Sequence, residues 1–331
     1  MGAIAARATR SASRKARRTE AVATGPLGAL SHDELGVIFD GLADPLQPVV
    51  AVALSSTCPG LRTPLRAALE VLQERHARAV ALCRKVGRNC AELRGAGELD
   101  WINRGLTAAD MATLAMILCT NGLLRLQRLD LPFNRFGNAG MQALCEGLSR
   151  GGAPSLRVLN LNSNQLGPAG AEALAAALHR GAMPKLEVLW LGGNPIGNQG
   201  VASLVLALRT LPVLKNLRLT FCEIGDEGVS SLFANLGKDD FKALESLDFR
   251  HNKITQKGLP SKLTAALDAT GGMPKLTSCF MLDDPTHASE VQGVHDALAR
   301  YLARRSECLE LASSALALAS SAMGHPSSSL Q

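Results

Sequence analysis

Side chains that could perform catalysis or bind a metal are few and scattered in this sequence. The eight cysteines include no Cys-x-x-Cys pair, and no histidine stands at the spacing that would complete a zinc site. Asp283-Asp284 has the composition of a two-carboxylate site, but paired acids are also common in solvated loops. Phosphate-binding loops and the motifs of hydrolases and kinases do not occur. We therefore expect no catalytic residue, no metal and no cofactor.

Aromatic and arginine side chains are the other candidates, because they anchor protein interfaces by burying a broad, planar group at low entropic cost. Aromatic residues make up only 3% of the chain, so their positions are informative. Trp190 and Arg218 lie 28 residues apart within a repeating part of the sequence. The residues that we expect at a partner-binding surface are Trp190, Arg218, Phe133, Phe221, Asn160, Asp130, Asp248 and Arg250.

A repeat of 28 to 30 residues must position these side chains. Its units begin at Leu126, Leu156, Leu186, Leu214 and Leu244. Each unit opens with leucines at alternate positions, which predicts a short strand, and continues with leucines four residues apart, which predict a helix. Fainter copies flank the five clear ones, and we count about seven units. Because helices need more room than strands, the stack should curve with its strands on the inside.

A polar position recurs directly after each predicted strand. Asn134, Asn164, Asn194 and Asn252 share this position, and Cys222 takes it in the fourth unit. A side-chain amide there can pair with backbone groups where the chain leaves the strand. We expect these asparagines to form one buried ladder, with Cys222 as a buried member and not a nucleophile.

The strand leucines should point inward, which leaves the third, fifth, seventh and eighth positions of each unit on a shared concave surface. Trp190 beside Arg218 is the expected centre of the site, with Gly192 and Gly193 leaving room for a partner. The alternative is that Trp190 packs only on neighbouring side chains. Read down the stack, the fifth position gives Asp100, Asp130, Asn160, Trp190, Arg218, Asp248 and Phe280.

The pattern L-x-x-L-x-L-x-x-N-x-(L/I)-G and its period resemble the ribonuclease-inhibitor class of leucine-rich repeats, over residues 96–300. The resemblance implies an α/β solenoid, a curved arc with parallel strands on the concave side and helices on the convex side. Members of this class include receptors, inhibitors, scaffolds and GTPase activators, so the resemblance leaves the function open.

Residues 27–62 differ in kind and resemble an F-box, a helical module that docks the Skp-type adaptor of a cullin ubiquitin ligase. The residues that match its docking helix are Leu35, Ile38, Phe39 and Leu42, with Leu30, Asp33 and Cys58 nearby. Ser31 replaces the usual proline, and Pro59, Gly60 and Leu61 stand where basic and tryptophan residues are common. The alternative reading is a helical cap over the first repeat. Residues 63–95 are expected to form a connecting or capping helix.

The net charge of +6 comes from the start of the chain. Six of the 35 basic residues but only one of the 29 acidic residues lie within residues 1–25. We interpret residues 1–26 as a disordered basic tail that could direct organelle or nuclear import, and 301–331 as a helix end and disordered tail. The remainder is nearly neutral and lacks a long apolar run. We therefore expect a protein partner, no nucleic acid and no membrane, and an intracellular location, cytoplasmic or nuclear.

These expectations favour a non-enzymatic protein-interaction module. One hypothesis is a substrate-recruiting F-box and leucine-rich-repeat subunit of a cullin-type ubiquitin ligase. The alternatives are a stand-alone leucine-rich-repeat scaffold or inhibitor and a Ran-type GTPase activator, although no particular arginine identifies the last activity.

Overall fold

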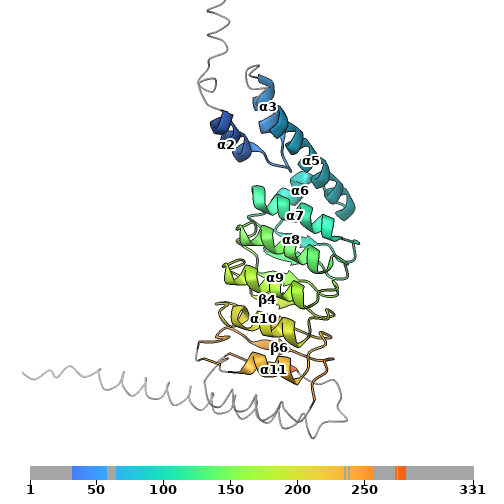
Figure 1. Ribbon diagram of the computed structural model, residues 1–331, viewed down its shortest axis with the longest axis vertical. Coiled ribbons are helices and arrows are strands. Elements are labelled where there is room, and N and C mark those ends of the chain that lie inside the picture. Colours follow the sequence, from blue (N-terminus) through green and yellow to red (C-terminus); the bar gives the residue numbers. More distant parts are fainter. Residues whose placement is uncertain are drawn as a thin grey trace, which may run out of the picture.

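A computed structural model describes residues 32–57, 65–234, 236–237, 239–255, 273 and 275–280 of this chain. Its repeating part alternates short strands with helices, and the helices line one side of the stack (Figure 1). The expected N-terminal and C-terminal tails, the helix end after residue 300 and Asp283-Asp284 lie outside the described residues.

Seven parallel strands form one sheet in the order β1-β2-β3-β4-β5-β6-β7. This arrangement confirms a strand in each of the five clear repeats and in one fainter copy at either end. Neighbouring strands pair in register, so that Leu129 lies opposite Leu159 and Leu159 opposite Leu189. The strands are β1 Glu98–Asp100, β2 Arg128–Asp130, β3 Val158–Asn160, β4 Val188–Trp190, β5 Asn216–Arg218, β6 Ser246–Asp248 and β7 Ser278–Phe280.

The helices that follow the strands pack on one another and on the sheet. Their inner stripes carry the leucines that the four-residue spacing predicted, such as Leu144, Leu174 and Leu204, and all three side chains are buried in the main core. Burial of these aliphatic ladders is the main stabilising contribution to the stack. The helices are α7 Ala108–Thr120, α8 Gly137–Ser149, α9 Pro168–His179, α10 Gly197–Arg209 and α11 Asp226–Phe233.

The hydrogen bonds of the predicted asparagine ladder are confirmed, and three of its asparagines are buried, but Asn252 at its C-terminal end is only half buried. Asn194 donates through Nδ2 to the carbonyl oxygens of Leu161 (2.9 Å) and Leu191 (2.7 Å). Its Oδ1 accepts from the backbone N–H groups of Asn164 (2.9 Å) and Leu166 (3.0 Å). Asn134 and Asn252 repeat both sets of bonds in their own units, and Asn164 repeats those of Nδ2. Each amide thereby ties its own turn to the preceding repeat.

Cys222 also takes its predicted place in the ladder. Its sulfur lies 3.4 Å from the carbonyl oxygens of Leu191 and Thr220, where the amide nitrogen stands in the other units. Burial raises the pKa of the Cys222 thiol to about 12, so the thiolate form is disfavoured. This side chain is therefore a structural one, as expected.

A second set of polar links joins the repeats on the helix side. Asn138, in the first turn of α8, accepts hydrogen bonds from the backbone N–H groups of Gly167 (2.8 Å) and Gly170 (3.1 Å), where α9 begins. Asn198 in α10 does the same for Gly225, where α11 begins (2.7 Å). A Cβ atom on Gly170 would lie 2.7 Å from Asn138 Oδ1, and one on Gly228 would lie 2.8 Å from Asn198 Oδ1, which explains the glycine at these two places.

Gly170→Ala should lower the free energy of unfolding by about 1 to 2 kcal/mol, because the new methyl group must displace Asn138 and weaken its two hydrogen bonds. Thermal unfolding should show a midpoint about 2 to 8 °C lower. Gly95→Ala is the matched control, since its Cβ would meet nothing within 4 Å, and it should leave the midpoint nearly unchanged. Equal midpoints for the two variants would contradict this account of the glycine.

The described helices before the repeats are α2 His32–Leu42, α3 Val49–Thr57, α5 Arg66–Val86 and α6 Cys90–Gly95. Leu93 of α6 belongs to the main core, whereas the first three helices contribute to a second hydrophobic cluster outside the repeat register. Leu35 and Phe39 of α2 are buried there with Leu72 of α5. The segment predicted as one connecting helix is thus two helices, separated by Gly87 in the left-handed conformation that ends α5.

Helix α5 connects the two clusters. Its first half contributes Leu72 to the N-terminal cluster, whereas Ala79, Leu82 and Val86 of its second half belong to the main core. The turn after α2 is attached to the repeats as well, because Asp44 forms an ion pair with Arg94 of α6. The expected boundary between residues 62 and 63 lies outside the described residues, and the described helices before and after it share one hydrophobic cluster.

Candidate protein-binding surface

The candidate surface is the side of the sheet that faces away from the helices, which we call the strand face. Strand side chains alternate between the two sides, so the third and fifth positions of each unit point to the strand face. The register places the fifth-position residues in a single row, and Trp190 stands opposite Asn160 on one side and Arg218 on the other. This row matches the one that the sequence predicted.

Trp190 and Arg218 lie in contact near the middle of the row. The guanidinium carbon of Arg218 is 5.0 Å from the centroid of the Trp190 ring, and that of Arg128 is 6.0 Å away. The indole N–H of Trp190 donates to Asn216 Oδ1 at 3.1 Å. The ring is only half buried. It is therefore held in a fixed orientation while part of its surface faces solvent.

On the C-terminal side of Trp190, Arg250 and Asp248 form an ion pair. Arg250 donates to both carboxylate oxygens of Asp248, at 3.0 and 2.8 Å, and its guanidinium carbon lies 4.9 Å from the Phe280 ring centroid. Burial pushes the pKa of Asp248 upward, but the hydrogen bonds and charge of Arg250, together with the charge of Arg218, outweigh it and hold that pKa below its ordinary value. Arg128 and Asp130 form a similar pair in β2.

Three predicted contact residues are less accessible than the sequence suggested. Asp130, Asn160 and Asp248 are all buried, with 5%, 7% and 5% of their surface exposed. Asp130 and Asp248 lie beneath the arginines that they bind. They consequently position Arg128 and Arg250 and offer a partner little surface of their own.

Lowering the pH should break the ion pair between Asp248 and Arg250 only in the acid range. Because the pKa of Asp248 is lower in the folded protein than in the unfolded chain, its stabilising contribution is present above about pH 4 and is lost as the pH falls through the folded value. We expect the Nε–H resonance of Arg250 to stay protected from exchange between pH 5 and 7 and to lose protection below about pH 4. Loss of protection near pH 6 would contradict the assigned pair.

Phe133 and Phe221 occupy the turns that follow β2 and β5, and they do not touch Trp190. They are 61% and 56% exposed, and both adopt the left-handed backbone conformation. Phe221 stacks on His251 of the next unit with ring centroids 4.0 Å apart. Trp190 and Arg218 thus form a central pair, and the two phenylalanines are separate positions in the turns.

The two glycines near Trp190 do not leave open space. A Cβ atom on Gly192 would lie 2.6 Å from Thr220 Oγ1, and one on Gly193 would lie 2.6 Å from Ser163 Oγ. These glycines therefore allow adjacent turns to approach closely, which corrects our sequence-based interpretation.

Two residues of the surface were not predicted. Arg128 and Asn216 both contact Trp190 from the third position of their units, whereas His251, which stacks on Phe221, stands at the eighth position that the sequence placed on the concave side. The third position was expected to face the concave side, so reading its residues down the stack in the same way as the fifth would have found the first two.

The F-box-like residues divide into buried and half-buried positions. Leu35 and Phe39 are 5% and 1% exposed, whereas Ile38 and Leu42 are half buried. A groove of about 270 Å³ between α2 and α5 is lined by Phe39, Ala43, Val71 and Arg75, among others. The buried pair holds the helices together, and the half-buried pair retains surface that a partner could contact.

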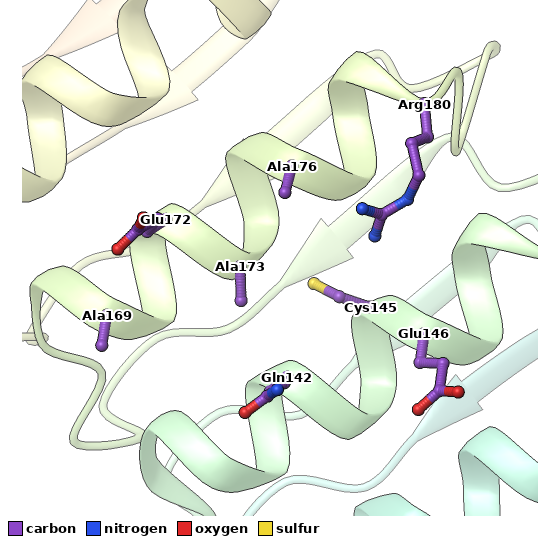
Figure 2. Close-up of a pocket in the computed structure, with 8 residues that line it drawn as sticks. All are labelled: Gln142, Cys145, Glu146, Ala169, Glu172, Ala173, Ala176 and Arg180. Atoms are coloured by element: carbon purple, nitrogen blue, oxygen red, sulfur yellow. The ribbon is translucent and has the colours of Figure 1, made fainter.

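A larger groove of about 430 Å³ lies between α8 and α9 on the helix side. Figure 2 shows Cys145 and Arg180 at this groove, with alanines along the wall formed by α9. Burial raises the pKa of Cys145 to about 12, and Arg180 donates to Ser149. In the part of the chain that the structure describes, no group of three or more potential ligands could hold a metal, and no helix is long and apolar enough to cross a membrane.

A family model described as "Leucine Rich repeat" matches residues 126–145, 152–175, 182–205, 210–233 and 243–259. The chain contains leucine-rich repeats. The matches cover the five clear units, and the sheet register extends the leucine-rich-repeat stack by β1 and β7.

Among solved structures, a crystal structure of a TLR13-ssRNA13 complex is 21% identical over 58% of this chain, with a TM-score of 0.30. The matched part spans 31% of that protein's chain. No curated protein matches this chain.

Proposed function

We propose that this chain is a non-enzymatic protein-interaction module whose strand face binds a segment of a partner protein, with Trp190 and Arg218 at the centre. The observation that carries this proposal is the Trp190–Arg218 contact, held by Asn216 and half exposed in the middle of the strand face. Tryptophan and arginine dominate binding energy where they are oriented before the partner arrives. The 28- to 30-residue period and the full helix after most strands favour the ribonuclease-inhibitor class of repeat.

The charges of the strand face suit binding better than catalysis. A general base needs a carboxylate whose proton affinity is raised, yet the pKa of Asp248 is lowered and both its oxygens accept from Arg250. Asp130 is occupied by Arg128 in the same way. The row therefore offers shape, aromatic surface and guanidinium groups to a partner.

The test is a selection of binders on the intact protein, followed by variants on both sides of the sheet. Peptides from a random display library should bind wild-type protein and lose affinity for Trp190→Ala. They should keep their affinity for Leu206→Ala, which removes a 63% exposed side chain from α10 on the helix side. Peptides whose affinity is unchanged by Trp190→Ala but lowered by Leu206→Ala would refute the proposal.

A second function concerns the helices before the repeats, where we propose docking of a Skp-type adaptor as in an F-box subunit of a cullin ubiquitin ligase. The supporting observation is apolar exposure on these short helices. Val37, Val49 and Val50 are 74%, 73% and 56% exposed, beside a core formed by Leu35 and Phe39. Large exposed apolar side chains gathered on one small unit commonly mark an interaction site.

Recovery of the adaptor and the cullin with the full chain, but not with Val37→Asp/Val49→Asp, would support this second function. Both substitutions alter exposed side chains, so the variant should stay folded, as circular dichroism can check. If neither protein is recovered with wild type, the stand-alone scaffold or inhibitor is favoured. Acceleration of GTP hydrolysis by a Ran-type GTPase would favour the activator.

We also propose an intracellular location, cytoplasmic or nuclear. Cys83 and Cys90 lie with their sulfur atoms 3.8 Å apart, within reach of a thiol hydrogen bond but not joined by a disulfide, which suits a reducing compartment. Fluorescence microscopy of the tagged chain tests this location.

A further inference from the structure

We propose that the strand face recognises an extended protein segment with a polarity: a carboxylate side chain of the segment binds Arg218, and basic side chains lie toward β1. This inference rests on the proposed function and names the chemistry of its partner.

Arg218 differs from the other two arginines described on the strand face, Arg128 and Arg250, in its hydrogen bonds. Arg128 and Arg250 each donate to an aspartate two residues away in their own unit. Two residues before Arg218 stands Asn216, whose amide oxygen accepts from Trp190. The nearest carboxylate oxygen, Asp248 Oδ2, lies 3.7 Å from Arg218 Nε and already accepts from Arg250 at 2.8 Å. Of the three arginines, Arg218 therefore has the most N–H groups available to donate hydrogen bonds to a partner.

The surroundings of Arg218 strengthen its attraction for an oxyanion. Its Nε atom is buried and has no hydrogen-bond partner in the described part of the chain, and the Trp190 ring covers one side of the guanidinium. A partly dehydrated guanidinium gains more from a bidentate carboxylate than a fully hydrated one does. The side chain is still 39% exposed, so a partner can reach it.

The local charge favours a carboxylate over a phosphate group. The guanidinium of Arg218 is only loosely paired with Asp248, at 3.7 Å, and the charge of that carboxylate is already neutralised by Arg250 at 2.8 Å. A single negative charge matches this site, whereas a phosphate group with nearly two charges would lack a second cation and would lie close to Asp248. A nucleic acid, with phosphates at every nucleotide, would in addition meet the acidic residues of β1.

The opposite end of the row carries the opposite charge. Glu98 and Asp100 of β1 are exposed and form no ion pair within the described residues. The residues between β1 and Arg218 add no net charge. They are Arg128 and Asp130, which form an ion pair, and the neutral Asn160 and Trp190. Four strand spacings separate Asp100 from Arg218, about 19 Å, which an extended peptide of about six residues spans.

The test is the sequence preference of peptides selected from a random 12-residue display library on the intact protein. Enriched peptides should share an acidic residue next to an aromatic or aliphatic one, with lysine or arginine about six residues away. Replacing that acid with its amide in a synthetic peptide should weaken binding about tenfold, as should Arg218→Gln. Combining both changes should cost little more than either alone. Arg180→Gln, which removes the same charge on the helix side, should have no effect.

The outcomes separate this inference from the proposed function. Peptides that depend on Trp190 but show no acidic preference would overturn the inference and leave the proposed function standing. Peptides indifferent to both Trp190→Ala and Arg218→Gln, or no enrichment at all, would overturn both. Tighter binding of a phosphoserine peptide, or displacement of the acidic peptide by a single-stranded RNA oligonucleotide, would overturn the choice of a protein carboxylate.

Discussion

Replacing Asn194 with leucine should lower the free energy of unfolding of the repeat stack by about 4 kcal/mol, since four backbone groups lose their partners at about 1 kcal/mol or more each. The groups are the carbonyls of Leu161 and Leu191 and the N–H groups of Asn164 and Leu166. Asn194 is fully buried, so water cannot replace the amide without opening the turn. Leucine has a similar volume, and the cost therefore reports lost hydrogen bonds more than a cavity.

Urea unfolding followed by circular dichroism measures this loss, and Asn121→Ala is the control. Asn121 is exposed after the end of α7, and its replacement should change the free energy by less than about 0.5 kcal/mol. If Asn194→Leu behaved like Asn121→Ala, the ladder would not stabilise the stack in the way described.

Trp190→Ala should weaken binding of a strand-face peptide at least tenfold. A central aromatic anchor commonly contributes about 2 kcal/mol or more to binding, and this ring is already oriented by its bond to Asn216. The folded protein loses less, because a partly exposed ring with cation–π contacts contributes about 1 kcal/mol, equivalent to a midpoint shift of about 2 to 4 °C.

Calorimetric titration of the wild type and the variant with one peptide, together with thermal scans of both, gives the two quantities separately. Phe133→Ala serves as a comparison from the edge of the surface, and its effect on affinity should be small. A Trp190→Ala protein that unfolds readily while keeping its affinity per folded molecule would show that Trp190 is a packing residue and not an anchor.

The repeat architecture could be predicted from the sequence because one pattern recurs with the same spacing. Leucines at alternate positions and then four residues apart specify strand and helix, and the recurrence of Asn134, Asn164 and Asn194 fixes the register. Once the register is known, the alignment of Trp190 with Arg218 follows directly.

The partners of individual side chains could not be predicted in the same way. Spacing places Asp248 on the strand face, but it does not reveal that Arg250 folds back two residues to cover it. Nor does it show that Phe221 turns toward His251 or that Thr220 fills the space above Gly192. These outcomes depend on side-chain conformations and on competition for the same carboxylate, which a periodic pattern does not encode.

Hydroxyl-radical footprinting of the intact protein, with and without a bound strand-face peptide, would show which side of the sheet binds a partner. Trp190 on the strand face, Phe221 in the turn after β5 and Leu206 on the helix side are all at least partly exposed and can report oxidation in the free protein. We expect the peptide to protect Trp190 most, to protect Phe221 less, and to leave oxidation of Leu206 unchanged. If the peptide instead protected Leu206 and left the oxidation rate of Trp190 unchanged, the strand face would not be the binding surface.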